Sequence, residues 1–219
     1  MPPKIKILLV DDHPLVREGV ANLINQQPDL EVCGEAGNEP QALQLIGTTG
    51  PDVAVVDISL ANGSGLELIK SIKAVHPAVA VLVLSMHDES LYAERALRAG
   101  ARGYIMKSEA AKKVIAGVRA VLAGQLYVSE KIAALMAEKF VEGRTAASAS
   151  PVEQLSDREL EVFQLLGRGQ STRQIADHLH VGFKTVQAYC ARIKEKLKLA
   201  NATELLREAM HWNDRQQGK

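Results

Sequence analysis

Carboxylates follow two of the apolar, strand-like runs in the first half of the chain. Asp11 and Asp12 come directly after the run 5–10, and Asp57 ends the run 53–57. A hard cation such as Mg²⁺ prefers oxygen ligands and commonly takes carboxylates together with phosphate oxygens. A carboxylate can also attack phosphorus and become an acyl phosphate. If the fold brings these side chains together, they are suited to bind Mg²⁺ and to accept a phosphoryl group.

Two more polar groups stand at the ends of later strand-like runs. Ser85 ends the run 79–85, and Lys107 follows the run 102–106. In open α/β sheets, functional groups gather at the carboxyl ends of the strands, so all these groups are expected to converge. An ammonium group, a hydroxyl and a metal ion would then share the charge on transferring phosphoryl oxygens. Each residue alone is equally an ordinary loop residue, but the joint set favours a phosphoryl-transfer site.

The elements that must position these groups are strands and helices in alternation. Strand-like runs cover 5–10, 31–36, 53–57, 79–85 and 102–106. Amphipathic segments of helix length lie between and after them, at 14–26, 39–46, 65–76, 89–99 and 109–123. Because the strands are mostly apolar and β-branched, they predict a parallel sheet covered by helices on both faces. We therefore expect an α/β, doubly wound five-stranded parallel sheet. If its strand order is the flavodoxin-like 2-1-3-4-5, strands one, three and four are neighbours and the polar groups at their ends converge.

The second part of the chain is predicted to be helical. After a helical segment over 129–142, the stretch 145–151 is small, polar and uncharged, which is typical of a flexible linker. Ser156 and Glu159 have the spacing of a capping box and begin a helix that ends at one of the glycines that follow. Three more helices are expected, from Ser171 or Thr172 to Leu179, over 182–198, and from Asn201 or Thr203 to near Trp212. We therefore divide the chain into a first domain (4–125), a linker helix and flexible linker (126–153) and a small all-α, four-helix domain (154–214).

The composition excludes several classes of protein. A hydrophobic fraction of 47% in 219 residues is enough for packed cores, but every apolar run is far shorter than the ~20 residues of a transmembrane helix. The two cysteines, Cys33 and Cys190, lie far apart, which argues against a disulfide framework or a zinc knuckle. Residues 1–6 contain no signal-peptide apolar segment. We therefore expect a cytoplasmic protein that does not use a membrane.

The segment 174–198 has the pattern of a helix-turn-helix. Its apolar residues are spaced for one inward face, formed by Ile175, Leu179, Val186, Ile193 and Leu197. A recognition helix lies in the major groove, where its outward side chains reach base edges and phosphates. We expect base contacts from Gln187, Ala188 and Ala191, and phosphate contacts from Lys184, Thr185, Arg192 and Lys194. From charge alone, a helical bundle with a solvated basic face fits 182–198 equally well.

Four short motifs in the first domain resemble those of a known family. Residues 10–19 (VDDHPLVREG) resemble the opening motif of bacterial two-component receiver domains, in the version typical of the NarL/FixJ family. Residues 55–57 (VVD), 84–85 (LS) and 104–107 (YIMK) fall where that family has its other signature residues. The resemblance covers 4–125.

The receiver resemblance implies a role for each of the polar residues. It implies that Asp57 is the phosphoacceptor and that Lys107 pairs with the phosphoryl group. Ser85 and Tyr104 would form the switch, with the Tyr104 ring changing rotamer as Ser85 moves toward the phosphoryl group. The Mg²⁺ ligands that it implies are Asp11, Asp12, Asp57 and the backbone carbonyl of Ser59.

The first domain departs from the family pattern at two places. Leu60-Ala61 stands where Met-Pro often follows the phosphoacceptor, which predicts a differently shaped loop, and Ser108 stands where many receivers have Pro. Neither change removes a chemical group from the site. His87, two residues after Ser85, is interpreted as a solvated loop histidine.

Residues 152–213 closely resemble a LuxR-type four-helix DNA-binding domain. The match begins at 155–162 (LSDRELEV) and continues to Leu197, with Tyr189 where many members have His. It implies that 182–198 reads double-stranded DNA and that the last helix, 201–213, dimerises. Together, the two resemblances imply a two-component response regulator. A sensor histidine kinase would phosphorylate it, and phosphorylation would control sequence-specific DNA binding by a homodimer and hence transcription.

Two other functions remain open on the sequence alone. One is a receiver whose helical domain acts through protein–protein contacts without DNA, because 151–219 has only 11 basic against 9 acidic residues, and Ala188 and Ala191 are neutral. The other is a phosphohydrolase that uses Asp57 as its nucleophile. Phosphohydrolases of the haloacid-dehalogenase kind need a second Asp two residues later, where this chain has Ser59, so we do not expect an enzyme.

Overall fold

A computed structural model describes residues 3–60, 63–141 and 151–217 of the chain. The chain divides into two compact units, Met1–Glu142 and Gly143–Lys219. The flexible linker expected at 145–151 lies outside the described residues, except for Pro151. That residue begins a short 3₁₀ helix, η3 (Pro151–Gln154), which the sequence did not predict.

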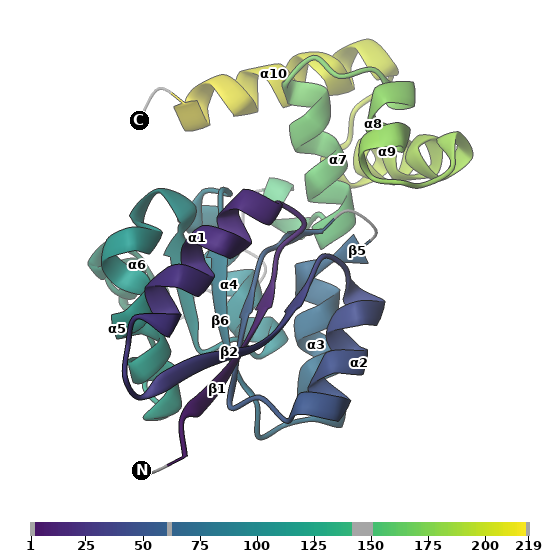
Figure 1. The fold of residues 1–219 in the computed structure, drawn as a ribbon. Helices are drawn as coiled ribbons and strands as arrows, with labels where there is room; N and C mark the ends of the chain where they lie inside the picture. The colour runs from purple at the N-terminus through teal and green to yellow at the C-terminus, as the bar shows by residue number, and fades with distance from the viewer. Residues whose placement is uncertain (1–2, 61–62, 142–150, 218–219) are drawn as a thin grey trace. The chain divides into compact units, whose positions relative to one another are not determined.

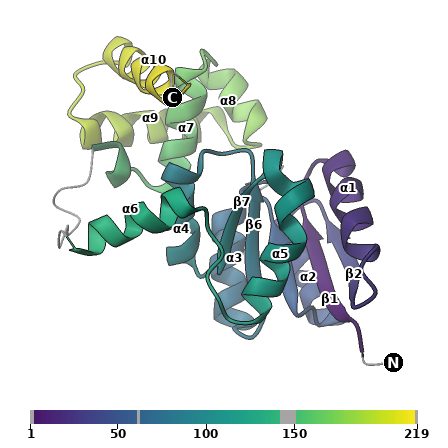
Figure 2. The ribbon, with the colours of Figure 1, turned by 90° about the vertical axis from the view of Figure 1, so that its left-hand side faces the viewer.

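The first unit is built on a parallel five-stranded sheet (Figures 1 and 2). In spatial order its strands are β2 (Leu30–Ala36), β1 (Ile5–Val10), β3 (Val53–Val56), β6 (Ala80–Ser85) and β7 (Gly103–Met106). This order confirms the flavodoxin-like prediction. One face of the sheet is covered by α1 (Pro14–Asn25) and α5 (Ala110–Leu122), and the other by α2 (Glu39–Thr49), α3 (Gly65–Val75) and α4 (Glu89–Ala99).

The strand register brings the carboxyl ends of the central strands to one level. Leu9 pairs with Val55, and Val55 pairs with Leu82, so these three buried side chains lie in one row across the sheet. They pack with apolar residues of α1 and α5 in a continuous core. One residue further along, Val10 pairs with Val56, so the residues that follow β1 and β3 must emerge side by side.

Several element boundaries differ from those predicted. Helix α2 continues to Thr49 rather than 46 and stops where Gly50 adopts a left-handed backbone (φ 56°), a conformation that favours glycine. The two-residue strands β4 (Ser59–Leu60) and β5 (Gly63–Ser64) form an antiparallel pair that is too short for a periodic pattern to reveal. The differently shaped loop expected at Leu60-Ala61 falls partly on 61–62, outside the described residues.

A linker helix, α6 (Glu130–Val141), belongs to the first unit and packs on α4. The segment before it extends the sheet, because the Tyr104 N–H donates to the Tyr127 carbonyl (2.8 Å). Ser129 Oγ then donates to Glu89 Oε1 (2.9 Å), and Lys139 Nζ lies 2.7 Å from Glu94 Oε2. Both ends of α6 are therefore tied to α4 by polar contacts.

The second unit consists of helices α7 (Asp157–Gly167), α8 (Thr172–His178), α9 (Phe183–Leu197) and α10 (Ala202–Gln217). Capping boxes begin α7 and α8, and the one predicted at Ser156 and Glu159 is confirmed. Helix α10 runs past the predicted end near Trp212, because the polar residues that follow include no helix breaker before Gly218. The Trp212 ring is buried against Phe163, with ring centroids 5.7 Å apart, so this residue is part of the core.

None of the helices in the described part of the chain is long and apolar enough to cross a membrane.

Gly65 lies against the loop that carries Asp57, and a larger residue there is expected to disrupt it. A Cβ at position 65 would lie 1.9 Å from the Asp57 carbonyl oxygen, whereas a Cβ at Gly47, in α2, meets no described atom within 4 Å. We expect Gly65→Ala to lower the free energy of unfolding by more than about 2 kcal/mol. Gly47→Ala should raise it by about 0.5–1 kcal/mol, since alanine favours the helix. Urea unfolding of the full chain, followed by the NMR amide signals of β3, measures both, and equal midpoints for the two variants would contradict this packing.

Candidate functional site

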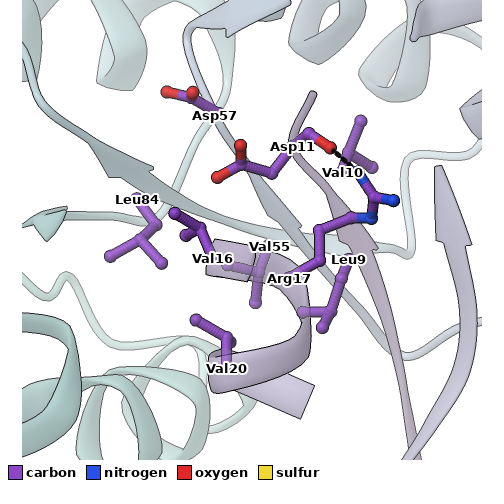
Figure 3. Close-up of a pocket in the computed structure, with 9 residues that line it drawn as sticks. All are labelled: Leu9, Val10, Asp11, Val16, Arg17, Val20, Val55, Asp57 and Leu84. Atoms are coloured by element: carbon purple, nitrogen blue, oxygen red, sulfur yellow. Dashed lines mark hydrogen bonds between the residues drawn. The ribbon is translucent and has the colours of Figure 1, made fainter. Parts of the chain in front are cut away.

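Two carboxylates meet where β1 and β3 end (Figure 3). The Asp57 N–H donates to the Val10 carbonyl (2.8 Å), and the Asp11 N–H donates to the Ala36 carbonyl (3.0 Å). These bonds continue the sheet by one residue on each strand. The side chains of Asp11 and Asp57 are 8% and 3% exposed, so both carboxylates are held out of water at the same edge.

Lys107 joins these two carboxylates. Its Nζ lies 2.6 Å from Asp11 Oδ2 and 2.7 Å from Asp57 Oδ2. The Lys107 side chain is 6% exposed, and it follows β7 at the start of the 3₁₀ turn η1 (Lys107–Glu109). The structure thus brings together the acid and base groups that the sequence placed at separate strand ends.

The electrostatics of the site favour an additional cation. Burial raises the pKa of Asp57 to about 6, although the Lys107 ammonium group acts in the opposite direction. Burial alone would lower the pKa of Lys107, but the neighbouring Asp57 and Asp11 outweigh it and raise that pKa above its usual value. The Lys107 ammonium group and a backbone hydrogen bond from Ser59 therefore leave the Asp57 carboxylate incompletely compensated at neutral pH.

The donor set fits a hard divalent cation. One possible ligand atom from each of Asp11, Asp12, His13 and Asp57 lies within 4.8 Å of the others. Oδ1 of Asp57 is buried, and no hydrogen-bond donor contacts it within the described part of the chain. A buried acceptor of this kind is costly unless a cation or a donor reaches it. Carboxylate oxygens are the ligands that Mg²⁺ prefers, so the residues present suit that ion.

The two expected switch residues both bind the backbone of His87. Ser85 is fully buried, and its Oγ accepts a hydrogen bond from the His87 N–H (3.2 Å). The Tyr104 hydroxyl donates to the His87 carbonyl (2.8 Å), and the Tyr104 side chain is buried. In this structure, therefore, the Tyr104 ring lies inward.

The interpretation of His87 as a solvated loop histidine is wrong. The residue is half-buried, and its ring centroid lies 4.5 Å from that of Tyr92. Its Nε2 lies 2.7 Å from Ser59 Oγ, and the two groups share a hydrogen bond. His87 thus joins the loop after β3 to the loop after β6. The available signal was positional, because Ser59 and His87 each lie two residues beyond a residue of the site.

In the second unit, α9 presents most of the expected DNA-binding residues to solvent. Val186 and Ile193 are buried as predicted, and Leu197 is partly buried. Lys194 is half-buried, so it is less free than expected, whereas the other six candidates are exposed: Lys184, Thr185, Gln187, Ala188, Ala191 and Arg192. Lys196 turns away from this surface, since its Nζ lies 2.6 Å from Glu159 Oε2.

Comparison with known families gives one match for each of the two units. Residues 7–119 match the family model described as the response regulator receiver domain, and residues 153–209 match the one described as bacterial regulatory proteins, luxR family. The chain is a response regulator. It combines a receiver domain with a LuxR-type DNA-binding domain, as the NarL/FixJ resemblance implied.

Two relatives match this response regulator over nearly the whole of their own length. The oxygen regulatory protein NreC of Staphylococcus epidermidis is 35% identical over 211 residues, which cover 94% of this chain and 97% of NreC. A LuxR-family two-component response regulator from Aurantimonas is 38% identical, with a TM-score of 0.59 over 63% of this chain and 99% of that one.

A further solved structure shares the fold. RcsB of Salmonella typhimurium has a TM-score of 0.68 at 24% identity over 95% of this chain and 98% of that one. RcsB has also been solved bound to the promoter rprA in the presence of the phosphomimetic BeF₃⁻, a structure that matches this chain with a TM-score of 0.62.

The raised pKa of Asp57 predicts a pH-dependent gain in stability for Asp57→Asn. The folded-state pKa, about 6, lies above the unfolded value of 3.8, so ionisation of this group costs folding free energy. The cost is absent below about pH 4 and complete above about pH 7, where it reaches about 3 kcal/mol. In Mg²⁺-free buffer the stability of Asp57→Asn relative to wild type should therefore grow over this pH range. Urea unfolding at several pH values measures it, and a constant difference would contradict the burial cost.

Proposed function

We propose that phosphoryl transfer to Asp57 controls the DNA binding of this response regulator. The supporting observation is the buried Asp57 carboxylate, with Oδ2 held by Lys107 and Oδ1 without a donor among the described residues. We assign 4–125 as the receiver, 126–153 as the linker helix and flexible linker, and 154–214 as the DNA-binding domain. Because its target would be DNA, we place the protein in the cytoplasm.

The proposed reaction transfers a phosphoryl group from the phosphohistidine of a sensor histidine kinase. A carboxylate oxygen of Asp57 attacks phosphorus, a new O–P bond forms, and the P–N bond breaks as the imidazole leaves. Lys107 keeps the attacking carboxylate in place and stabilises the phosphoryl oxygens. Asp11, Asp12, Asp57 and the Ser59 carbonyl would hold Mg²⁺, which supplies further positive charge to those oxygens.

The proposed route to the output passes through His87 and β7. The Ser85 hydroxyl now accepts a hydrogen bond from the His87 N–H. A phosphoryl group on Asp57 would attract this hydroxyl and break that bond. Tyr104 holds the carbonyl of His87, and its own N–H binds the Tyr127 carbonyl just before α6. A displacement of the loop that carries His87 would thereby change the position of the segment before α6, and with it the contact between α4 and α6 and the linker.

The proposed DNA-binding surface is the outward face of α9. Gln187, Ala188 and Ala191 would meet base edges, and Lys184, Thr185, Arg192 and Lys194 would bind phosphates. Helix α10 exposes Leu206 (41%) and Met210 (45%) one turn apart, which supports a homodimer on DNA. RcsB, which shares this fold, has been solved bound to a promoter and as dimers bound to DNA, and this supports DNA and a second copy of the chain as partners.

We expect acetyl phosphate with Mg²⁺ to add one phosphoryl group to the full chain, detected by intact-protein mass. Asp57→Asn should abolish the addition, Lys107→Met should slow it about a hundredfold, and chelation of Mg²⁺ should prevent it. Asp52→Asn is the matched control, because Asp52 precedes β3 at the end away from Asp57, where its side chain accepts from the Lys6 N–H and its backbone bonds to Lys6 and Ala80. Phosphorylation that persists in Asp57→Asn would refute the assignment.

The phosphate contacts of α9 predict a specific change in salt dependence. Arg192→Met should lower the slope of log affinity against log salt by about one unit for any DNA sequence. Lys196→Met removes the same charge from the same helix. Because the Lys196 ammonium group pairs with Glu159 rather than with DNA, the slope should not change. Fluorescence anisotropy with a DNA duplex measures both. An unchanged slope in Arg192→Met would refute the phosphate contact of this residue. If no DNA bound at all, the protein-contact function would replace this proposal.

A further inference from the structure

Arg17 makes a contact with the acidic site that none of the roles above requires. From the first turns of α1 its Nη1 donates to the backbone carbonyl of Asp11 at 2.5 Å (Figure 3). Its Nε lies 3.2 Å from Glu35 Oε2, next to the end of β2. The Arg17 side chain is 19% exposed, so its guanidinium group is enclosed between α1 and the sheet edge.

The Asp11 carbonyl needs a donor that the sheet does not supply. The last sheet bonds on β1 use the Val10 carbonyl and the Asp11 N–H. In the first turn of α1, the N–H groups of Val16 and Arg17 donate to the His13 carbonyl instead. Asp11 is nearly fully buried, and a buried carbonyl without a partner is costly. The guanidinium group of Arg17 fills this role.

Other side chains around this bond cannot replace Arg17. The cavity beside it is lined by the apolar side chains of Leu9, Val10, Val16, Val20, Val55 and Leu84. The only other polar side chains that line it in the described structure are Asp11 and Asp57, which are carboxylates and accept rather than donate. Without Arg17, the carbonyl would lose its donor, and the peptide would have to rotate to find another.

Rotation of this peptide would move both acidic side chains. The Asp11 carbonyl and the Asp12 N–H belong to one planar peptide group, so the bond to Arg17 fixes the direction in which Asp12 leaves β1. On the other side of the residue, Asp11 Oδ1 accepts from the His13 N–H (2.9 Å) and Oδ2 contacts Lys107. Backbone and side chain of Asp11 are thus fixed from opposite directions.

We propose that Arg17 is a positioning residue that sets the affinity of the acidic site for Mg²⁺. It holds the Asp11–Asp12 peptide so that the acidic pair faces Asp57, and Glu35 keeps the guanidinium group in place. The inference rests on the proposed phosphorylation site, but it concerns metal binding before any phosphoryl transfer.

The test compares the Mg²⁺ affinity of the full chain and its variants by NMR titration of the amide signals around Asp11. Arg17→Met keeps the apolar stem and removes the donor, so we expect the Mg²⁺ dissociation constant to rise about tenfold. Arg17→Lys keeps a donor and should recover part of the loss. Arg119→Met is the matched control, because it removes an arginine that pairs with Asp29 at the surface, and it should leave the affinity unchanged.

A second readout separates positioning from a general loss of structure. With acetyl phosphate, the Mg²⁺ concentration for half-maximal phosphorylation should rise in Arg17→Met, while the rate at saturating Mg²⁺ stays within about threefold of wild type. The inference is overturned if Arg17→Met binds Mg²⁺ as tightly as wild type. It is also overturned if the Mg²⁺ affinity falls equally in Arg17→Met and Arg17→Lys and amide signals shift throughout the sheet, because the loss would then come from a general change of structure. Failure of wild type to become phosphorylated at Asp57 would refute the proposed function, yet the titration would still test Arg17.

Discussion

The Lys107 ammonium group lies between two buried carboxylates, and the geometry of the first unit depends on this contact. Parallel register forces Asp11 and Asp57 to emerge side by side, where two negative charges in a dry environment repel each other. Lys107 contacts one oxygen of each, and the other Asp57 oxygen has no donor within the described residues. The positions of the carboxylates are therefore fixed, but their negative charge is not fully neutralised. A bound cation would stabilise such a site, and the Asp57 carboxylate is already in position to accept a phosphoryl group.

The same edge of the sheet also holds the groups that can report on that acceptor. His87 binds Ser59 through its ring, Ser85 through its N–H and Tyr104 through its carbonyl, so one residue joins the segment after β3 to the end of β6 and to β7. Tyr104 continues this connection to Tyr127 and the start of α6. A series of hydrogen bonds thus runs from Ser59 and Ser85, beside Asp57, to the segment before the linker helix, and the proposed coupling would use it.

Much of the fold could be predicted because its signals are local and repeated. Alternating strand and helix patterns were sufficient for a parallel five-stranded sheet, whose order matches the flavodoxin-like one, and the capping box at Ser156 fixed the start of α7. The convergence of Asp11, Asp57 and Lys107 followed from the rule that parallel strands end at one edge. The residues that were missed act through tertiary contacts. Sequence patterns do not show that Lys196 pairs with Glu159 or that a Cβ at Gly65 would overlap the Asp57 carbonyl.

The central claim, that the state of Asp57 controls what α9 binds, is tested most directly by selecting bound fragments from genomic DNA. The selection would use the full chain with Mg²⁺, with and without beryllofluoride as a phosphoryl mimic, and Asp57→Asn as the control. The account predicts enrichment of a two-fold-symmetric site that strengthens with the mimic in wild type and not in the variant. Enrichment of the same site to the same degree with and without the mimic would contradict it.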